Sequence, residues 1–275
     1  MTRPRVITNN AQLFASYQEL EAGDIVLGRL RLAVGQEHLL LDLVSRGVVL
    51  MPSASSQLCS RSKVYQTALL GSFMLPLTRP VYSCQEMLAL VTEYGRAGVG
   101  PVVCKLDRAN GGLGILRFPS VEEVYSQVVL ETLHCPFVIQ PFMDDCQDVR
   151  VVILGETVEA YRRYNPGNFR HNLHCGGESQ PWHLSEEQFG FCQKIMARAG
   201  FPYAHVDLLI QPDGSVSLSE INLRGGLRGA RLSQADYVKK VASLHGRALA
   251  QYKKACNCSA APHSVAIRPP HIDGL

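Results

Sequence analysis

The sequence has few of the features that mark specialised classes of protein. None of its apolar runs approaches the ~18 uninterrupted residues of a membrane-spanning helix. Its first residues, Met-Thr-Arg-Pro-Arg-Val, lack the apolar core of a secretory signal. The net charge is only +3, without any run of five basic residues, which argues against nucleic acid as a partner. With 46% hydrophobic and 19% charged residues, the 275-residue chain is expected to fold as an ordinary globular protein. We predict a cytoplasmic protein that contacts neither membrane nor nucleic acid.

Cysteines occur in an odd number, nine, without the spacing of a disulfide framework and without a C-x-x-C pair. Five of them lie in apolar segments, where a reduced thiol behaves as a small hydrophobic side chain. These are Cys59, Cys84, Cys104, Cys135 and Cys192. This usage favours a reducing cytoplasm. Cys256 and Cys258 form a C-x-C pair able to bind a metal, but no second pair accompanies it. We interpret the pair as part of a flexible tail over residues 255–275.

The order of apolar patterns predicts two parts before that tail. Residues 1–60 contain strand-length apolar runs at 24–27 and 48–51 and a helical pattern over 10–22, which predicts a short α/β region. Residues 61–254 combine helical patterns with mostly antiparallel strands, which indicates the α+β class. The expected helices span 60–73, 83–94, 120–130, 185–200 and 233–252. The expected strands span 76–82, 101–105, 114–118, 136–140, 148–154, 157–161, 204–210 and 216–221, and 164–180 is predicted as a loop.

The strongest chemical pattern lies on a predicted hairpin, whose strands 204–210 and 216–221 are joined by Gln-Pro-Asp-Gly-Ser. Asp207 lies among apolar neighbours, while Glu220 and Asn222 are two residues apart and share a face. If Asp207 faces the same side, three oxygen-bearing side chains converge. Buried carboxylates need a cation or donors, and hard oxygen ligands suit Mg²⁺ better than Zn²⁺ or Ca²⁺. The alternative is a pair of half-exposed strand carboxylates without a ligand.

Two further patterns offer groups that suit phosphate. Lys105 ends a predicted strand and opens into Leu-Asp-Arg-Ala-Asn-Gly-Gly-Leu-Gly, so an ammonium and backbone N–H groups are available to phosphate oxygens. A plain glycine hairpin is the alternative, and the strand that follows excludes a Walker or Rossmann motif. Three arginines with Asn172 in the loop 162–177 fit recognition of phosphate and carboxylate. The spacing of His171 and His174 carries no metal signal in a loop.

In this order the segments resemble the ATP-grasp superfamily, specifically its RimK-like ligases, which add amino acids to a carboxylate. The likeness runs from about Lys63 to Ala250. Lys63 and Lys105 match the family's two ATP lysines, and Phe-Val-Ile-Gln-Pro-Phe-Met at 137–143 is similar to the hinge strand that holds adenine. Four further segments match the family's Asp-x-Arg, phosphate-facing and magnesium segments. They are Asp-Val-Arg at 148–150, Phe-Arg-His-Asn-Leu-His-Cys-Gly-Gly at 169–177, Val-Asp-Leu-Leu at 206–209 and Glu-Ile-Asn at 220–222.

The resemblance implies an ATP-grasp fold, in which two α+β subdomains over residues 61–254 clasp ATP after the short N-terminal region 1–60. It implies Mg²⁺, with Mn²⁺ as a substitute, on Asp207, Glu220 and Asn222. The ATP-binding residues that it implies are Lys63, Lys105, Gly111, Gly112, Gln140, Pro141, Phe142, Asp148, Arg170, His171 and Asn172. The catalytic residues that it implies are Arg163, Arg170 and Arg224.

The chain departs from the family in three places. Pro141 stands where the family usually has Glu, so Gln140 or Asp144 is the expected substitute for a polar contact to the nucleotide. After Asn222 the chain continues Leu-Arg-Gly-Gly instead of Ser-Pro-Gly, which makes Arg224 a candidate for stabilising the transition state. The N-terminal region is shorter than the family's usual one, which helps to form the substrate pocket. The family's substrates are therefore not assigned to this chain.

The function that the resemblance implies is an ATP-dependent carboxylate–amine ligase. The γ-phosphoryl group is transferred to a carboxylate, an amine attacks the acylphosphate, and ADP and phosphate are released. The expected partners are a small-molecule, peptide or protein-terminus carboxylate and an amino acid or amine. A homo-oligomer is also expected from the resemblance. The alternatives are an ATP-grasp phosphotransferase and a nucleotide-binding module without ligase activity. Replacing Asp207 and Glu220 by alanine is expected to abolish magnesium-dependent turnover and to leave the fold intact.

Overall fold

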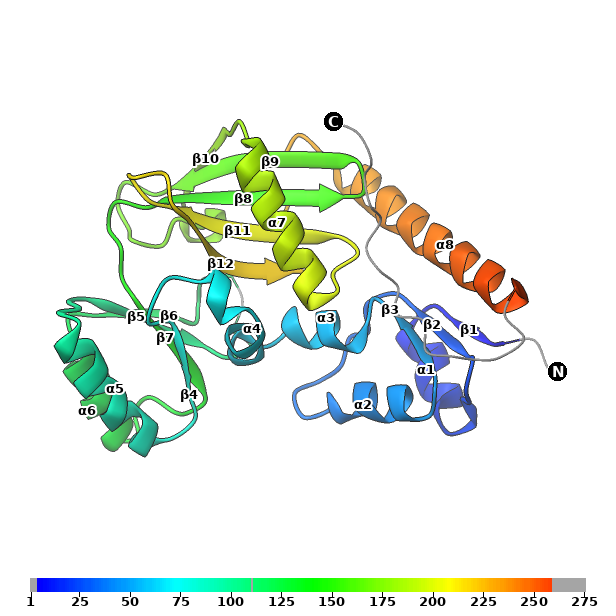
Figure 1. Ribbon diagram of the computed structural model, residues 1–275, viewed down its shortest axis with the longest axis horizontal. Helices are drawn as coiled ribbons and strands as arrows, with labels where there is room; N and C mark the ends of the chain where they lie inside the picture. Colours follow the sequence, from blue (N-terminus) through cyan, green and yellow to red (C-terminus); the bar gives the residue numbers. More distant parts are fainter. Residues whose placement is uncertain (1–3, 110, 259–275) are drawn as a thin grey trace.

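The computed structural model describes residues 4–109 and 111–258, with the side chains of 257 and 258 excepted. Asn110, in the glycine-rich segment, and most of the expected tail lie outside the described residues. In the described part, three sheets follow one another along the chain (Figure 1). Helices and sheets occur together in each, which confirms the α+β class.

The first sheet is parallel, in the order β1 (Val6–Ile7), β2 (Ile25–Leu27) and β3 (Val49–Met51). Helices α1 (Asn10–Ser16) and α2 (His38–Ser45) pack on it through buried leucines, and α3 (Ala54–Cys59) leads out of this unit. The helix expected over 10–22 is shorter, because the chain tightens into a 3-10 turn at Tyr17–Glu19 and becomes extended at Leu20. The two-residue β1 and the helix α2 were not predicted.

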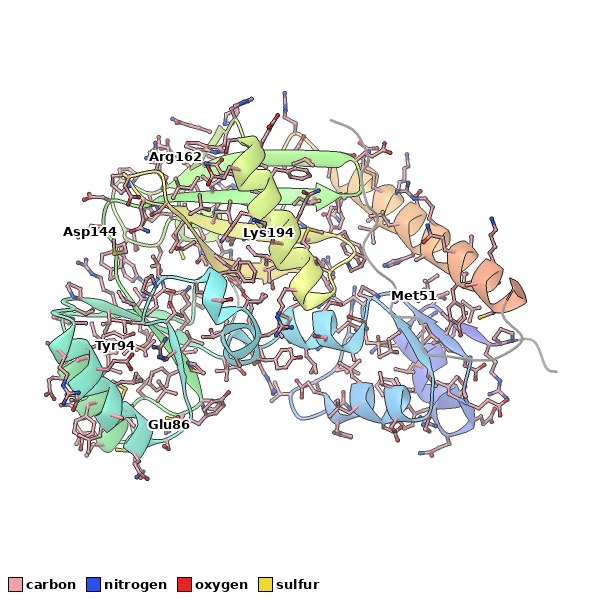
Figure 2. The ribbon with its side chains drawn as sticks, viewed as in Figure 1. Met51, Glu86, Tyr94, Asp144, Arg162 and Lys194 are labelled. Carbon is pink, nitrogen blue, oxygen red and sulfur yellow. The ribbon has the colours of Figure 1, made fainter. Side chains whose placement is uncertain are left out.

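The second sheet is antiparallel and contains β4 (Arg79–Val81), β7 (Phe137–Pro141), β5 (Val102–Leu106) and β6 (Ile115–Phe118), in that order. Helices α5 (Cys84–Arg96) and α6 (Val121–Val129) lie together on one face (Figure 1). Ser83 caps α5 by accepting a hydrogen bond from the Glu86 N–H. Tyr94 of α5 is fully buried, and its hydroxyl donates to the carbonyl of Leu77 at 2.5 Å (Figure 2).

The third sheet is antiparallel, in the order β10 (Glu178–Pro181), β9 (Thr157–Tyr164), β8 (Gln147–Leu154), β11 (Ala204–Ile210) and β12 (Val216–Asn222). Helix α7 (Glu186–Ala199) crosses this sheet (Figure 1). Ser185 caps its start, and Gly200, at φ 71°, ends it. Strand β10 lies inside the stretch predicted as a loop. The last helix, α8 (Gln234–Cys258), begins near the expected residue and runs past 252 into the expected tail.

Helix α4 (Lys63–Leu70) contacts both antiparallel sheets, through β4 and β7 on one side and β12 on the other. Its helical pattern was predicted to begin at residue 60, but Ser62 caps it by accepting from the Tyr65 N–H, so Lys63 is its first residue. A 3-10 turn at Gly71–Phe73 continues it. None of the described helices combines the length and apolarity needed to cross a bilayer.

Candidate active site

A cavity of about 910 Å³ lies where the three sheets meet. The antiparallel sheets contribute the ends of β5, β7, β8, β11 and β12, and the N-terminal unit contributes the segment that follows β2. Every residue predicted for the ATP, catalytic and metal sets lines this cavity, except Pro141. The structure therefore brings together residues that are up to 161 positions apart, from Lys63 to Arg224.

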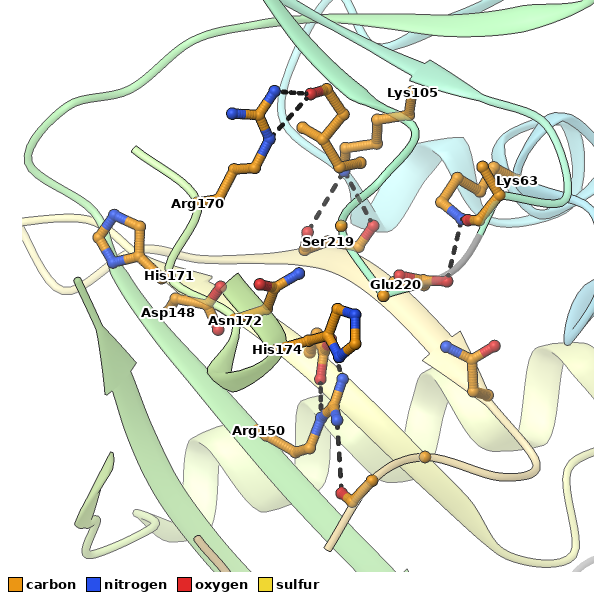
Figure 3. A pocket seen from close by; sticks show the side chains of 18 of the residues that line it. Lys63, Lys105, Asp148, Arg150, Arg170, His171, Asn172, His174, Ser219 and Glu220 are labelled. Atoms are coloured by element: carbon orange, nitrogen blue, oxygen red, sulfur yellow. Dashed lines mark hydrogen bonds and ion pairs between the residues drawn. The ribbon is translucent and has the colours of Figure 1, made fainter. Parts of the chain in front are cut away.

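Two buried lysines enter the cavity from different elements (Figure 3). Lys63, at the start of α4, donates to the carbonyl of Ala109 at 2.6 Å and lies 3.4 Å from a Glu220 carboxylate oxygen. Lys105, on β5, donates to the backbone and hydroxyl oxygens of Ser219 at 3.2 and 3.3 Å. Burial lowers the pKa of Lys105 to about 8. Both ammonium groups are thus held close to β12.

Asp207, Glu220 and Asn222 face the same side of the hairpin, as expected. Asp207 is paired across the ladder with Glu220, and His205 is paired with Asn222. Glu220 keeps a side chain that is 25% exposed, and Asn222 is half-buried on the cavity wall. Asp207 is only 5% exposed. The three side chains share one wall, but their surroundings differ.

Asp207 is held by two arginines. Arg150, labelled in Figure 3, donates from Nε and Nη2 to the two carboxylate oxygens, each at 2.7 Å, and Arg163 approaches one of these oxygens at 3.0 Å. Burial by itself raises the pKa of Asp207, but the two guanidinium groups outweigh it and hold this pKa well below its ordinary value. The structure therefore argues against an Asp207→Ala replacement that leaves the fold intact, because the buried Arg150 would lose its counter-charge and the buried Arg163 would lose one of its two carboxylate partners.

Arg163 also binds Asp148, donating from Nε at 2.8 Å and from Nη2 at 2.5 Å. Asp148, Arg163, Asp207 and Arg150 thus form one chain of alternating charges across β9, β8 and β11. Arg150 was not among the predicted site residues. The sequence does place it two residues from Asp148, on the same face of a strand, but its pairing with Asp207 depends on the register of two strands.

The donor set fits a hard divalent cation. Among the described residues, no three His, Cys, Asp or Glu side chains gather into a metal-holding cluster. The predicted set consists of two carboxylates and one amide, which is the oxygen chemistry that Mg²⁺ prefers. Glu220 and Asn222 present these oxygens to the cavity. Asp207 already accepts from Arg150 at both carboxylate oxygens, which leaves it fewer lone pairs for a cation than Glu220 has.

The glycine-rich turn after β5 and the loop 165–177 meet over the cavity. Arg170 donates to the carbonyl of Ile115 from Nε at 3.1 Å and from Nη2 at 2.5 Å. Gly112 has φ +80°, and a Cβ built there lies 2.0 Å from the Asn172 Nδ2 atom. Only glycine fits this approach, because the left-handed backbone and the neighbouring amide both exclude a side chain. The two loops therefore contact each other directly.

Helix α4 is joined to the strand that carries Glu220 and Asn222. The Gln66 amide donates to the Ile221 carbonyl and accepts from the Ile221 N–H, both at 2.9 Å. The Ser60 hydroxyl accepts from the Leu223 N–H at 2.9 Å. Neither residue carries a motif, so sequence analysis had no signal for these contacts. They fix the start of α4, and with it Lys63, against the strand that carries Glu220 and Asn222.

A family model described as a RimK-like ATP-grasp domain matches residues 64–244. The chain belongs to this family. Sequence comparison finds a probable alpha-L-glutamate ligase of Trichodesmium erythraeum (strain IMS101), 29% identical over 177 residues, which are 62% of this chain and 58% of that protein. The chain therefore spans little more than half the length of this relative.

Two solved structures share the fold. The VanG D-Ala:D-Ser ligase from Enterococcus faecalis matches with a TM-score of 0.59 and 18% identity, covering 81% of this chain and 73% of that one. The D-cycloserine synthetase DcsG matches with a TM-score of 0.58 and 17% identity, covering 88% and 98%. At these identities the likeness establishes the ATP-grasp fold, which the sequence analysis expected.

Proposed function

We propose that this RimK-like protein is an ATP-dependent carboxylate–amine ligase. The observation that carries the proposal is the convergence of two buried lysines, from α4 and β5, on a wall that presents Glu220 and Asn222. Two fixed ammonium groups beside hard oxygen ligands suit a magnesium-bound triphosphate. The names of the sequence relative and of VanG, both ligases, support the same reaction class.

In the proposed reaction, Lys63, Lys105 and Arg170 hold the triphosphate, and Gln140 and Phe142 of β7 form the nucleotide end of the cavity. Gly111, Gly112, His171 and Asn172 cover the phosphates and exclude water. Glu220, Asn222 and Asp207 would hold Mg²⁺, which would supply positive charge against the phosphate oxygens. Arg163 and Asp148 position Asp207.

The carboxylate substrate is phosphorylated by the γ-phosphoryl group, which leaves ADP, and Arg224 stabilises the resulting acylphosphate. An amine then attacks the acyl carbon and displaces phosphate, so an amide forms and one proton is released. The amine and the carboxylate belong to an amino acid, a peptide or a protein terminus. No protein nucleophile is needed.

We also propose that residues 1–60 and 61–254 act as the N-terminal region and the ATP-grasp domain. A reducing, cytoplasmic setting is supported by the cysteines, since the eight whose side chains the structure describes are all free. Burial raises the pKa of the Cys59 and Cys192 thiols to about 12, which keeps them protonated and unreactive.

The test is release of ADP and phosphate from Mg-ATP with pools of carboxylates and amino acids, with mass detection of the condensed product. Glu220→Gln removes a proposed metal ligand whose described ion-pair partner is Lys63, so it is expected to fold normally and to lose turnover by at least about a hundredfold. Glu156→Gln, on the exposed β8–β9 turn, is the matched control. Phosphate that fails to appear in proportion to the amine would contradict a ligase and favour a phosphotransferase. Unchanged turnover in Glu220→Gln would contradict the site.

A further inference from the structure

Arg29 enters the cavity from the N-terminal unit, at the carboxyl end of the central strand β2. In sheets of parallel strands, ligands bind outside the carboxyl ends of the strands. The strand ends at Leu27, and Gly28, at φ +116°, turns the chain so that Arg29 follows directly. Its side chain is half-buried. None of the predicted site residues comes from this unit.

The guanidinium of Arg29 lies among other cations. The charged groups that act on it most strongly are Arg224 and Arg31, and burial together with these two lowers its pKa. Within residues 4–109 and 111–258, no hydrogen bond or ion pair engages the guanidinium of Arg29 or that of Arg224. Like charges held together in a partly buried site are unfavourable without a counter-ion.

Arg61 lies beside Arg29 and is fixed in place. It donates from Nη1 to the carbonyl of Leu32 at 3.0 Å and from Nη2 to the carbonyl of Leu30. These carbonyls neutralise no charge. Of the charged groups that act on Arg61, Arg29 acts most strongly, and the carboxylate of Glu37, which also pairs with Arg108 at 3.3 Å, opposes it. The segment after β2 therefore holds two guanidinium groups on one side of the cavity.

Arg29 and Arg61 are not among the charged groups that act most strongly on Lys105, which are Glu220, Lys63, Asp148 and Asp207. Among the described residues, ten arginines and lysines line the cavity against four carboxylates. A magnesium-bound nucleotide on the proposed site beside Lys63 and Lys105 would carry too little negative charge to balance this excess.

We propose that Arg29, with Arg61 beside it, binds a second anionic group of the substrate whose carboxylate reacts next to Arg224. The ligand is a carboxylate or a phosphate on the same molecule, so the carboxylate substrate is at least dianionic. This rests on the proposed ligase function. Arg29 belongs to the short N-terminal region and Arg61 follows directly after it, so the subsite gives that region a part in selecting the substrate.

The test compares matched pairs of probes that keep one carboxylate and change only the second group. N-acetyl-aspartate, N-acetyl-glutamate and N-acetyl-phosphoserine are titrated calorimetrically against the full chain with Mg²⁺ and ADP, beside N-acetyl-asparagine, N-acetyl-glutamine and N-acetyl-serine. At least one anionic member is expected to bind about tenfold tighter than its neutral partner. The acidic and phosphorylated probes separate carboxylate from phosphate as the group bound.

Arg29→Gln is expected to remove this preference. Arg31→Gln, which removes a charge from an exposed side chain outside the cavity lining, is expected to keep it. Thermal unfolding of both variants checks the fold. The inference is overturned if no anionic probe binds better than its neutral partner, if the preference survives in Arg29→Gln, or if both variants lose it equally.

Turnover separates this inference from the ligase proposal. ADP release driven equally by monoanionic and dianionic carboxylates leaves the ligase standing and overturns the subsite. An anionic preference that depends on Arg29, without ADP release from any carboxylate and amine pair, supports the subsite and counts against the ligase.

Discussion

The buried carboxylate of Asp207 is expected to be as important to folding as to any chemistry. In Asp207→Asn, Arg150 loses both of its carboxylate contacts at 2.7 Å, while Arg163 loses one at 3.0 Å and keeps Asp148. Breaking a buried ion pair from one side costs about 3–5 kcal/mol, because the remaining charge stays out of water. Since Arg163 keeps a partner, the lower end of that range, about 3 kcal/mol, is the expected loss of unfolding free energy.

Urea unfolding at pH 7, followed by circular dichroism, measures this loss. Glu156→Gln is the control, since it removes an exposed carboxylate from the same sheet. The pH dependence gives a second reading. The pKa of Asp207 is lower in the folded than in the unfolded chain, so its stabilisation is complete above its ordinary pKa of about 4 and is lost as the pH falls further. Asp207→Asn is expected to lack this component. A loss below about 1 kcal/mol at pH 7 would refute the reasoning.

Three further outcomes are expected. Gly112→Ala forces Asn172 away and should raise the KM for ATP several-fold. The control Gly214→Ala is also at positive φ but has open space around it, so it should cost only about 1 kcal/mol of stability and leave the KM for ATP unchanged. Equal KM values in the two variants would count against the contact. Apparent ATP affinity should weaken as the pH rises through about 8, where Lys105 loses its proton, so a plot of affinity against pH should show an inflection there. Lys105→Arg should abolish this inflection, because arginine keeps its charge. An inflection that persists in that variant belongs to another group. Gln66→Ala leaves the buried N–H and carbonyl of Ile221 in β12 unpaired, and should lower the free energy of unfolding in urea by about 2–4 kcal/mol. A loss below about 1 kcal/mol would contradict the role given to this amide.

Local signals made much of the fold predictable. Helices α5, α6 and α7 were expected close to their observed bounds, because serine caps and apolar periodicity mark them. The hairpin of β11 and β12 was expected from its Pro-Asp-Gly turn. The short strands β1 and β10 were missed because two to four residues carry no periodicity, and β10 is held by pairing with β9.

The site was predictable in its membership but not in its contacts. Lys63, Glu220 and Asn222 were expected because the family's segments occur in order, and the cavity does bring them together. Their assignment to ATP and metal stays a prediction. That Asp207 is shared by two arginines was not predictable, since it depends on strand register across three strands. Arg29 was missed for a different reason, because a lone arginine after a short strand has no local signature.

The contacts that α3, α4 and the segment after α4 make with β12 have a consequence for self-association. This strand is at the edge of its sheet, and edge strands are where chains pair to form aggregates. Here Met74 bridges to Leu218, Gln66 takes both backbone groups of Ile221, and Ser60 takes the N–H of Leu223. The backbone positions that a second chain would need are already bonded. Growth of the sheet by pairing along β12 is therefore hindered unless α4 first detaches, so the contacts that fix Lys63 also protect this edge of the sheet from pairing with another chain.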